Sequence, residues 1–191
     1  MTDIFINYRS DDDPFAAALI DERMTQAFGP ERVFRDARAL HPGVDFEPEL
    51  WARLRSSRVC LVLIGARWLG LTDERGNRRI DRADDFVAQE IAEALRCGLA
   101  VLPVLLNEAD LPTPGQLPES VRELAGRQFA RLRQRHAESD LRDLVDAVAR
   151  WVTPSPVVPQ QPTGKSFTAS SNSGNAYSAE TMTFNEQGPH R

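Results

Sequence analysis

A glutamate in the segment "DFVAQE" stands where it could do chemistry. Glu90 follows Phe86 by four residues, so in a helix the two side chains lie one turn apart on the same side. A carboxylate can stabilise positive charge that develops in a transition state, and a neighbouring ring can stack on a flat substrate group. Arg9, after the first apolar run, would add a cation that matches phosphate oxygens. One acid, one aromatic ring and one arginine therefore make a candidate site.

The helix that must position Glu90 has a clear apolar stripe. At about 100° per residue, five residues fall on one side of it: Val87, Ile91, Ala94, Leu95 and Gly98. Glu90 falls at the edge of this stripe, so we expect it to be partly buried against Phe86. The alternative interpretation is an edge glutamate in an ordinary surface salt bridge, with Arg9 as its partner.

The elements around this helix predict an α/β domain over residues 1 to about 152. Apolar runs typical of strands lie at 3–8, 32–36, 58–65, 99–106 and 127–132. Segments with helical patterns lie at 14–29, 47–57, 84–98 and 138–152. The strands are almost continuously apolar, which indicates a parallel sheet covered by helices on both faces.

The predicted sheet gives the position of Glu90 more meaning. In open α/β sheets, ligands bind beyond the carboxyl ends of the strands. The segments at that rim are "YRSDDD", "DARALHPGVDF" and "GARWLG", and the helix of Glu90 starts from the same rim. We therefore expect Tyr8, Arg9, Asp36 and Glu90 to converge although they are far apart along the chain.

Composition and motifs exclude several classes of function. The net charge of -5 argues against a protein that binds nucleic acid through its phosphates. Neither phosphate-loop nor dinucleotide-binding glycine patterns are present, and there is no G-x-S-x-G elbow. The three histidines, His41, His136 and His190, do not form a metal-ligand pattern. The remaining chemistry must come from a carboxylate or from Cys97.

The two cysteines and the start of the chain point to a reducing, cytoplasmic setting. Cys60 lies inside an apolar run and is expected to be a buried, reduced thiol, and Cys97 is also read as structural. Met1 is followed at once by "TDIFINYRS", without a signal-like region, and no apolar run is long enough to span a bilayer. We expect no membrane partner.

The composition changes at Thr153. Residues 153–165 are rich in proline and read as an extended linker. Residues 166–191 are polar and nearly uncharged, so they cannot bury a core of their own. Disorder is one interpretation. The other is cross-β assembly, because two strand-like runs flank an Asn/Ser/Gly turn.

Four segments together resemble the successive blocks of a Toll/interleukin-1 receptor (TIR) domain of the bacterial, NAD+-consuming type. They are "DIFINYRSDD", "VFRDARALHPGVDF", "CLVLIGARWL" and "DFVAQEIAEALRCGLAVLPVLL". The resemblance covers residues 1–152 and implies a flavodoxin-like fold, with a five-stranded parallel sheet flanked by helices. The tail at 166–191 weakly resembles the amyloid signalling motifs that recruit some bacterial immune effectors to a sensor protein.

The resemblance also implies an activity and its residues. Many TIR domains hydrolyse NAD+ to nicotinamide and ADP-ribose, or cyclise the ADP-ribose. By their W-x-x-x-E pattern, Glu90 would be the catalytic residue, with Phe86 in place of the usual Trp. Tyr8 and Arg9 would line the substrate, and Asp36 and Gly43 would belong to the loop that shapes the pocket and mediates assembly. His41 stands in this loop where some relatives have an acid.

One carboxylate is enough for this reaction. Hydrolysis of an O-glycoside needs two carboxyl groups, since the leaving oxygen must be protonated. The nicotinamide of NAD+ is already cationic and leaves neutral, so a single acid beside the ribose can stabilise the ribosyl cation. No cofactor is required, because NAD+ is the substrate.

Two functions follow from the resemblance. The first is an NAD+ glycohydrolase or ADP-ribosyl cyclase, activated by self-assembly in bacterial antiviral defence. The alternative is a non-catalytic adaptor that signals through TIR–TIR contacts, for which the exposed "ALHPGVDF" loop would serve.

Overall fold

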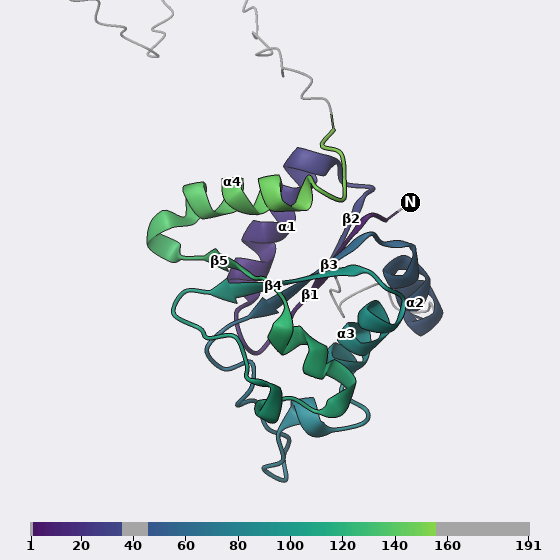
Figure 1. Cartoon of the computed structure of the whole chain (residues 1–191), viewed down its shortest axis with the longest axis vertical. Helices are drawn as coiled ribbons and strands as arrows, with labels where there is room; N and C mark the ends of the chain where they lie inside the picture. Colours follow the sequence, from purple (N-terminus) through teal and green to yellow (C-terminus); the bar gives the residue numbers. More distant parts are fainter. Residues whose placement is uncertain (1, 36–45, 156–191) are drawn as a thin grey trace, which may run out of the picture. The chain divides into compact units, whose positions relative to one another are not determined.

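Five parallel strands form one sheet in the computed structural model, which describes residues 2–35 and 46–155 (Figure 1). The strand order is β2-β1-β3-β4-β5. The strands are β1 (Ile4–Asn7), β2 (Val33–Arg35), β3 (Val59–Ile64), β4 (Ala100–Leu106) and β5 (Ala130–Leu132). All four neighbouring pairs are parallel, which confirms the predicted fold. From β1 the chain first moves to β2 and then returns to β3, so the ligand-binding switch point lies between β1 and β3.

Helices cover both faces of this sheet, as the continuous apolar strands predicted (Figure 1). One face carries α1 (Pro14–Phe28) and α4 (Ala137–Val148), and the other carries α2 (Phe46–Ser56) and α3 (Phe86–Arg96). Alternate residues of each strand therefore enter two separate cores. Phe5 and Cys60 pack under α2 and α3, whereas Ile4 and Leu61 pack under α1 and α4.

Within residues 2–35 and 46–155, four short 3-10 helices connect these elements: η1 (Arg79–Asp81), η2 (Pro114–Gln116), η3 (Glu119–Gly126) and η4 (Gln134–His136). The sequence patterns predicted none of them. In η3, Val121 and Leu124 are fully buried and join the core under α3. With these two buried residues alone, η3 has no repeated apolar stripe from which a helix would be predicted.

Two parts of the predicted organisation lie outside the described residues. They are the loop that contains Asp36 and Gly43, and the linker and tail from residue 156 onward. Within the described part, Ser155 contacts the end of α1 by donating from its backbone N–H to the carbonyl of Ala27 (2.9 Å). No helix in the described ranges is long and apolar enough to cross a membrane.

Candidate functional site

Glu90 belongs to the N-terminal half of α3, and its side chain points to the switch point between β1 and β3. Its side chain is buried, with 1% of the residue surface exposed. Asn7, the last residue of β1, donates a hydrogen bond from Nδ2 to Glu90 Oε2 at 2.6 Å and a second to the carbonyl of Val87 at 3.2 Å. The carboxylate is thus anchored to the end of a central strand, 83 residues away in the chain.

A buried ion pair lies beside this contact. Arg9 donates from Nη1 and Nη2 to the two carboxylate oxygens of Asp85, both at 2.8 Å. The two side chains expose only 0% and 3% of their surface. The guanidinium also lies over the ring of Trp68, with its carbon 5.4 Å from the ring centre. A bidentate pair with a stacked ring is the arrangement in which a buried arginine is best accommodated.

Local sequence explains why these contacts form. Asn7 and Arg9 are two residues apart at the end of β1, so both point to the α3 face. Asp85 is the N-cap of α3, and its Oδ1 also accepts a hydrogen bond from the backbone N–H of Ala88 (2.8 Å). One aspartate therefore starts the helix and binds the arginine, which fixes the first turn of α3 against β1.

A second contact fixes the loop after β1. The carboxylate of Asp12 accepts hydrogen bonds from the backbone N–H groups of Gly65 (2.7 Å) and Arg67 (2.9 Å). A Cβ atom at Gly65 would lie 2.6 Å from Asp12 Oδ2, so only glycine allows this close approach. The loops that follow β1 and β3 are in this way joined at the rim of the sheet.

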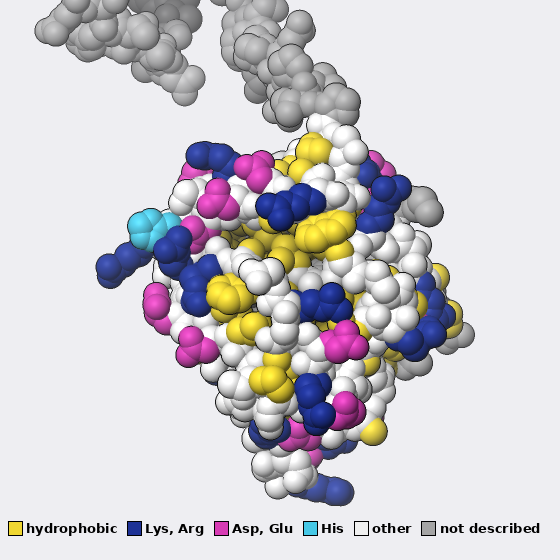
Figure 2. Space-filling view, in the orientation of Figure 1, with side chains coloured by type: hydrophobic (Ala, Val, Ile, Leu, Met, Phe, Trp, Pro, Cys, Tyr) yellow, Lys and Arg dark blue, Asp and Glu magenta, His cyan; other side chains and the backbone are white. Residues whose placement is uncertain are grey.

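A groove of about 610 Å³ is lined by residues of the segment before α3 and by Phe86, the first residue of α3. Its lining is strongly charged and of mixed sign: Thr72, Asp73, Glu74, Arg75, Arg79, Arg82, Asp84, Asp85 and Phe86. Most of these charges are already paired. Arg82 binds Asp73 and Asp84, and Arg79 binds Asp11. Figure 2 shows the same mixture of basic and acidic side chains on the face that it displays.

The structure corrects two expectations about Glu90 and Arg9. Glu90 is fully buried, not partly buried at the edge of the apolar stripe, because the end of β1 covers that edge. The surface salt bridge with Arg9 is wrong as well: the partner of Arg9 is Asp85. Since both Nη groups bind Asp85, the guanidinium in this conformation does not reach outward to a substrate phosphate.

The other predicted site residues are placed as follows. Phe86 is the first residue of α3, is half-buried and lines the charged groove. Tyr8 points to the opposite face of the sheet from Asn7 and Arg9, where it packs against the core under α1 and its ring contacts Arg35. The structure therefore does not bring Tyr8 beside Glu90. Asp36 and Gly43 are outside the described residues.

Sequence reasoning missed Asn7, Asp85 and Trp68. Asn7 carries a usable signal, because a polar residue that ends the apolar run "IFIN" has to find a partner when it is buried. Asp85 also has a sequence signal, because an aspartate directly before an apolar stripe is typical of a helix N-cap. Trp68 has no such sequence signal, since nothing in "GARWLG" indicates that its ring stacks on Arg9.

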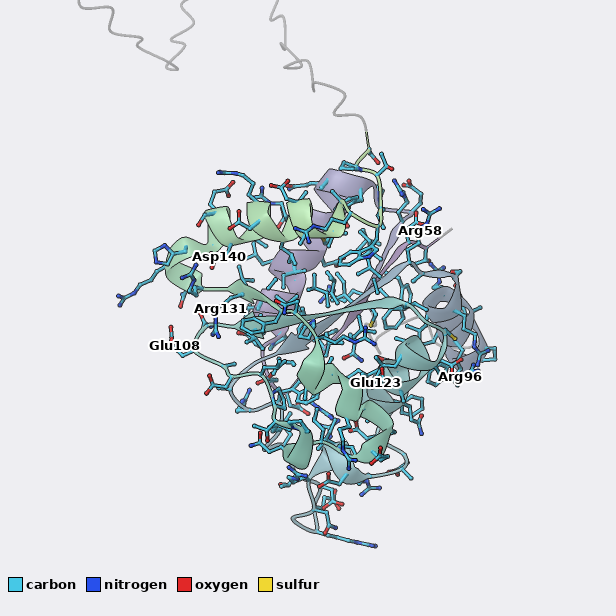
Figure 3. The ribbon with its side chains drawn as sticks, in the orientation of Figure 1. Arg58, Arg96, Glu108, Glu123, Arg131 and Asp140 are labelled. Carbon is cyan, nitrogen blue, oxygen red and sulfur yellow. The ribbon has the colours of Figure 1, made fainter. Side chains whose placement is uncertain are left out.

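Glu93 on the same helix is partly exposed and is paired with two arginines. Its carboxylate binds Arg96 and Arg55, and these two arginines hold the pKa of Glu93 down at about 2. Arg96 lies at the C-terminal end of α3 (Figure 3). Glu93 and Glu90 are thus matched acids of one helix, one at the surface and one in the core.

The two cysteines differ in the same way, and they give a first prediction. Burial, and secondarily the carboxylate of Glu90, raise the pKa of the Cys60 thiol, whereas Cys97 is exposed. Because the thiolate is the reactive form, iodoacetamide is expected to label Cys97 in the native protein and Cys60 only after unfolding. Mass spectrometry counts the labels, and two labels on the native protein would contradict the structure.

Comparisons with known proteins agree on the fold. The family model of the TIR domain matches residues 4–145. No curated protein matches the chain significantly. Among solved structures, the chain is similar to the TIR domains in the activated Roq1 resistosome directly recognizing the pathogen effector XopQ. The TM-score is 0.53 at 14% identity, over 78% of this chain and 99% of that one.

Proposed function

The chain belongs to the TIR domain family, and we propose that it is an NAD+ glycohydrolase or ADP-ribosyl cyclase whose catalytic residue is Glu90. The observation that carries the proposal is the buried contact between Glu90 and Asn7 at the switch point of the sheet. Placing an acid in a core is costly, so a buried glutamate at a ligand-binding rim indicates a functional role.

The proposed reaction needs one charge in the right place. The bond between nicotinamide and the ribose C1′ breaks, and its electron pair goes to the nicotinamide nitrogen, which leaves neutral. The carboxylate of Glu90 stabilises the ribosyl cation that results. Water then attacks C1′ and loses a proton, giving ADP-ribose. In the cyclase version a nucleophilic atom from the adenosine part of the same substrate attacks instead of water.

Two further residues have proposed roles in this reaction. Phe86 starts the helix that carries Glu90 and lines the groove, and its proposed role is to stack its ring on the nicotinamide or the ribose. The proposed role of Arg9 is to hold the first turn of α3 in place through its ion pair with Asp85. Asp36 and Gly43 are proposed as substrate-binding residues on the family resemblance alone.

Self-association through TIR–TIR contacts is proposed as the activating step, in a defence or immune role. The adaptor alternative predicts the same association without consumption of NAD+. A measurement of NAD+ consumption therefore distinguishes the two functions, whereas a measurement of the oligomeric state does not.

The deciding experiment incubates the purified 191-residue chain with NAD+ at low and at high protein concentration and separates the products by chromatography. We expect nicotinamide together with linear or cyclic ADP-ribose, formed faster per molecule at high concentration. Glu90→Ala is expected to form neither product, while Glu93→Ala behaves as wild type. Equal turnover by wild type and Glu90→Ala would sink the proposal, and assembly without any NAD+ loss would favour the adaptor.

A further inference from the structure

Asn7 is a buried polar residue whose side chain reaches α3 at two points. The residue has no exposed surface. Its Nδ2 donates to the carbonyl of Val87 and to the carboxylate of Glu90, at 3.2 Å and 2.6 Å. An amide nitrogen carries two hydrogens, so these two bonds use its full capacity as a donor.

The two acceptors fix the orientation of the amide. If the amide were turned over, Oδ1 would face a carbonyl oxygen and a carboxylate oxygen, and both contacts would be repulsive. Asn7 therefore presents a donor to Glu90 and cannot exchange it for an acceptor. The cost of this arrangement is visible in the same side chain: Oδ1 is buried and has no hydrogen-bond partner among the described residues.

The burial of Glu90 explains why such a donor matters. From β3, Cys60 presents a thiol whose pKa is raised by burial and by Glu90, so it stays protonated and adds no second negative charge. From β1 and the N-cap of α3, Arg9 and Asp85 face each other as a pair whose charges cancel. Burial disfavours an ionised carboxyl group, and a donor to the charged form offsets this effect. At 2.6 Å the Asn7 bond is short, as charge-assisted bonds are.

We propose that Asn7 is a positioning residue for the proposed NAD+ cleavage. It holds one oxygen of the Glu90 carboxylate in place and favours the ionised form that the ribosyl cation requires. This inference rests on the proposed function, since without that reaction the contact would serve the fold alone. Asn7 acts through Glu90, so its removal lowers kcat and leaves the binding of NAD+ nearly unchanged.

The first variant is Asn7→Ser, whose shorter hydroxyl cannot reach both acceptors. We expect kcat for NAD+ cleavage to fall about 10- to 100-fold, the scale of a misplaced catalytic group, with KM changed less than about threefold. The matched control is Val62→Ala, because Val62 lies beside Asn7 in the register of β1 and β3 and packs in the same core. The control is expected to lower the melting temperature and leave kcat unchanged. An equal fall of kcat in both variants would show that Asn7 serves only the fold.

The second variant is Asn7→Asp, and its readout is the pH profile of the activity. A purely structural role of Asn7 would leave the shape of this profile unchanged. Two carboxyl groups at this distance cannot both be ionised, so they share one proton at low pH. The shared proton replaces the lost donor, and the activity falls as the pH rises and the proton leaves. Wild type holds no such shared proton between two carboxyl groups and is expected not to show this loss of activity. A pH profile of Asn7→Asp parallel to that of wild type would overturn the proposal.

A third measurement does not depend on catalysis. The carboxyl carbon of Glu90 is followed by NMR during a pH titration, with Glu90→Gln to assign its signal. We expect the midpoint of the titration to move to higher pH in Asn7→Ser and to stay at its wild-type value in Val62→Ala. An unchanged midpoint in Asn7→Ser refutes the role of Asn7. A shifted midpoint in a chain that does not consume NAD+ supports the contact and refutes the proposed function instead.

Discussion

Glu90→Gln is expected to slow NAD+ cleavage about 100- to 1,000-fold, roughly 3–4 kcal/mol of transition-state stabilisation. Glutamine keeps the shape of the side chain and an oxygen that accepts the bond from Asn7, so the packing under α3 is retained. What disappears is the negative charge beside the ribosyl cation. The measurement is the initial rate of nicotinamide release at saturating NAD+, with circular dichroism to confirm the fold.

Glu93→Gln is the matched control for this prediction. Glu93 lies one turn further along α3 and is bound by Arg55 and Arg96 at the surface. Its replacement is expected to change the rate less than about twofold, because Glu93 contacts these two arginines and takes no part in the contact between Asn7 and Glu90. If Glu90→Gln were to keep half of the wild-type rate, the charge of Glu90 could not be the source of catalysis.

Arg9→Met is expected to lower the free energy of unfolding by about 3–5 kcal/mol, since it removes one partner of a buried ion pair. Asp85 would keep its negative charge, with 3% of its side chain exposed and only its contact to the first turn of α3 remaining. The stacking of the guanidinium on Trp68 is lost as well. Urea denaturation followed by fluorescence or circular dichroism measures the change.

The same pair allows a double-mutant test. Asp85→Asn removes the charge of Asp85 but keeps an oxygen that can cap the backbone N–H of Ala88. Combined with Arg9→Met, it leaves no unpaired charge in the core. The double variant is therefore expected to be more stable than Arg9→Met alone. Strictly additive losses would mean that the two side chains do not interact energetically.

The sheet was predictable because its signals are local. A six-residue apolar run such as 59–64 has to be buried on both faces, and that requirement already indicates a parallel sheet between helices. The ends of α1 are equally local, with Asp13 as N-cap and Gly29, at a φ of 98°, as C-cap. In contrast, η3 was not predicted, since its two buried side chains are too few to form a repeated apolar stripe.

The candidate site was predictable only in part. The spacing of Phe86 and Glu90, and the rim on which their helix starts, follow from the sequence. The helical angle placed Glu90 at the edge of the apolar stripe. This angle gives the direction of a side chain around its own helix axis, but it does not say whether the side chain is buried. Whether an edge is covered depends on what packs there, and here it is the end of β1.

The sequence by itself determined the order of strands and helices, the rim where a ligand would bind, and the acid that stands there. Only the tertiary structure decided the partners of that acid and of Arg9. The contacts of Asn7 with Glu90 and of Arg9 with Asp85 join residues 83 and 76 positions apart. Hydrogen bonds of this kind form because the sheet brings the end of β1 under the first turn of α3. The segments that contain these residues do not show this contact separately, because it forms only when the strand and the helix pack together.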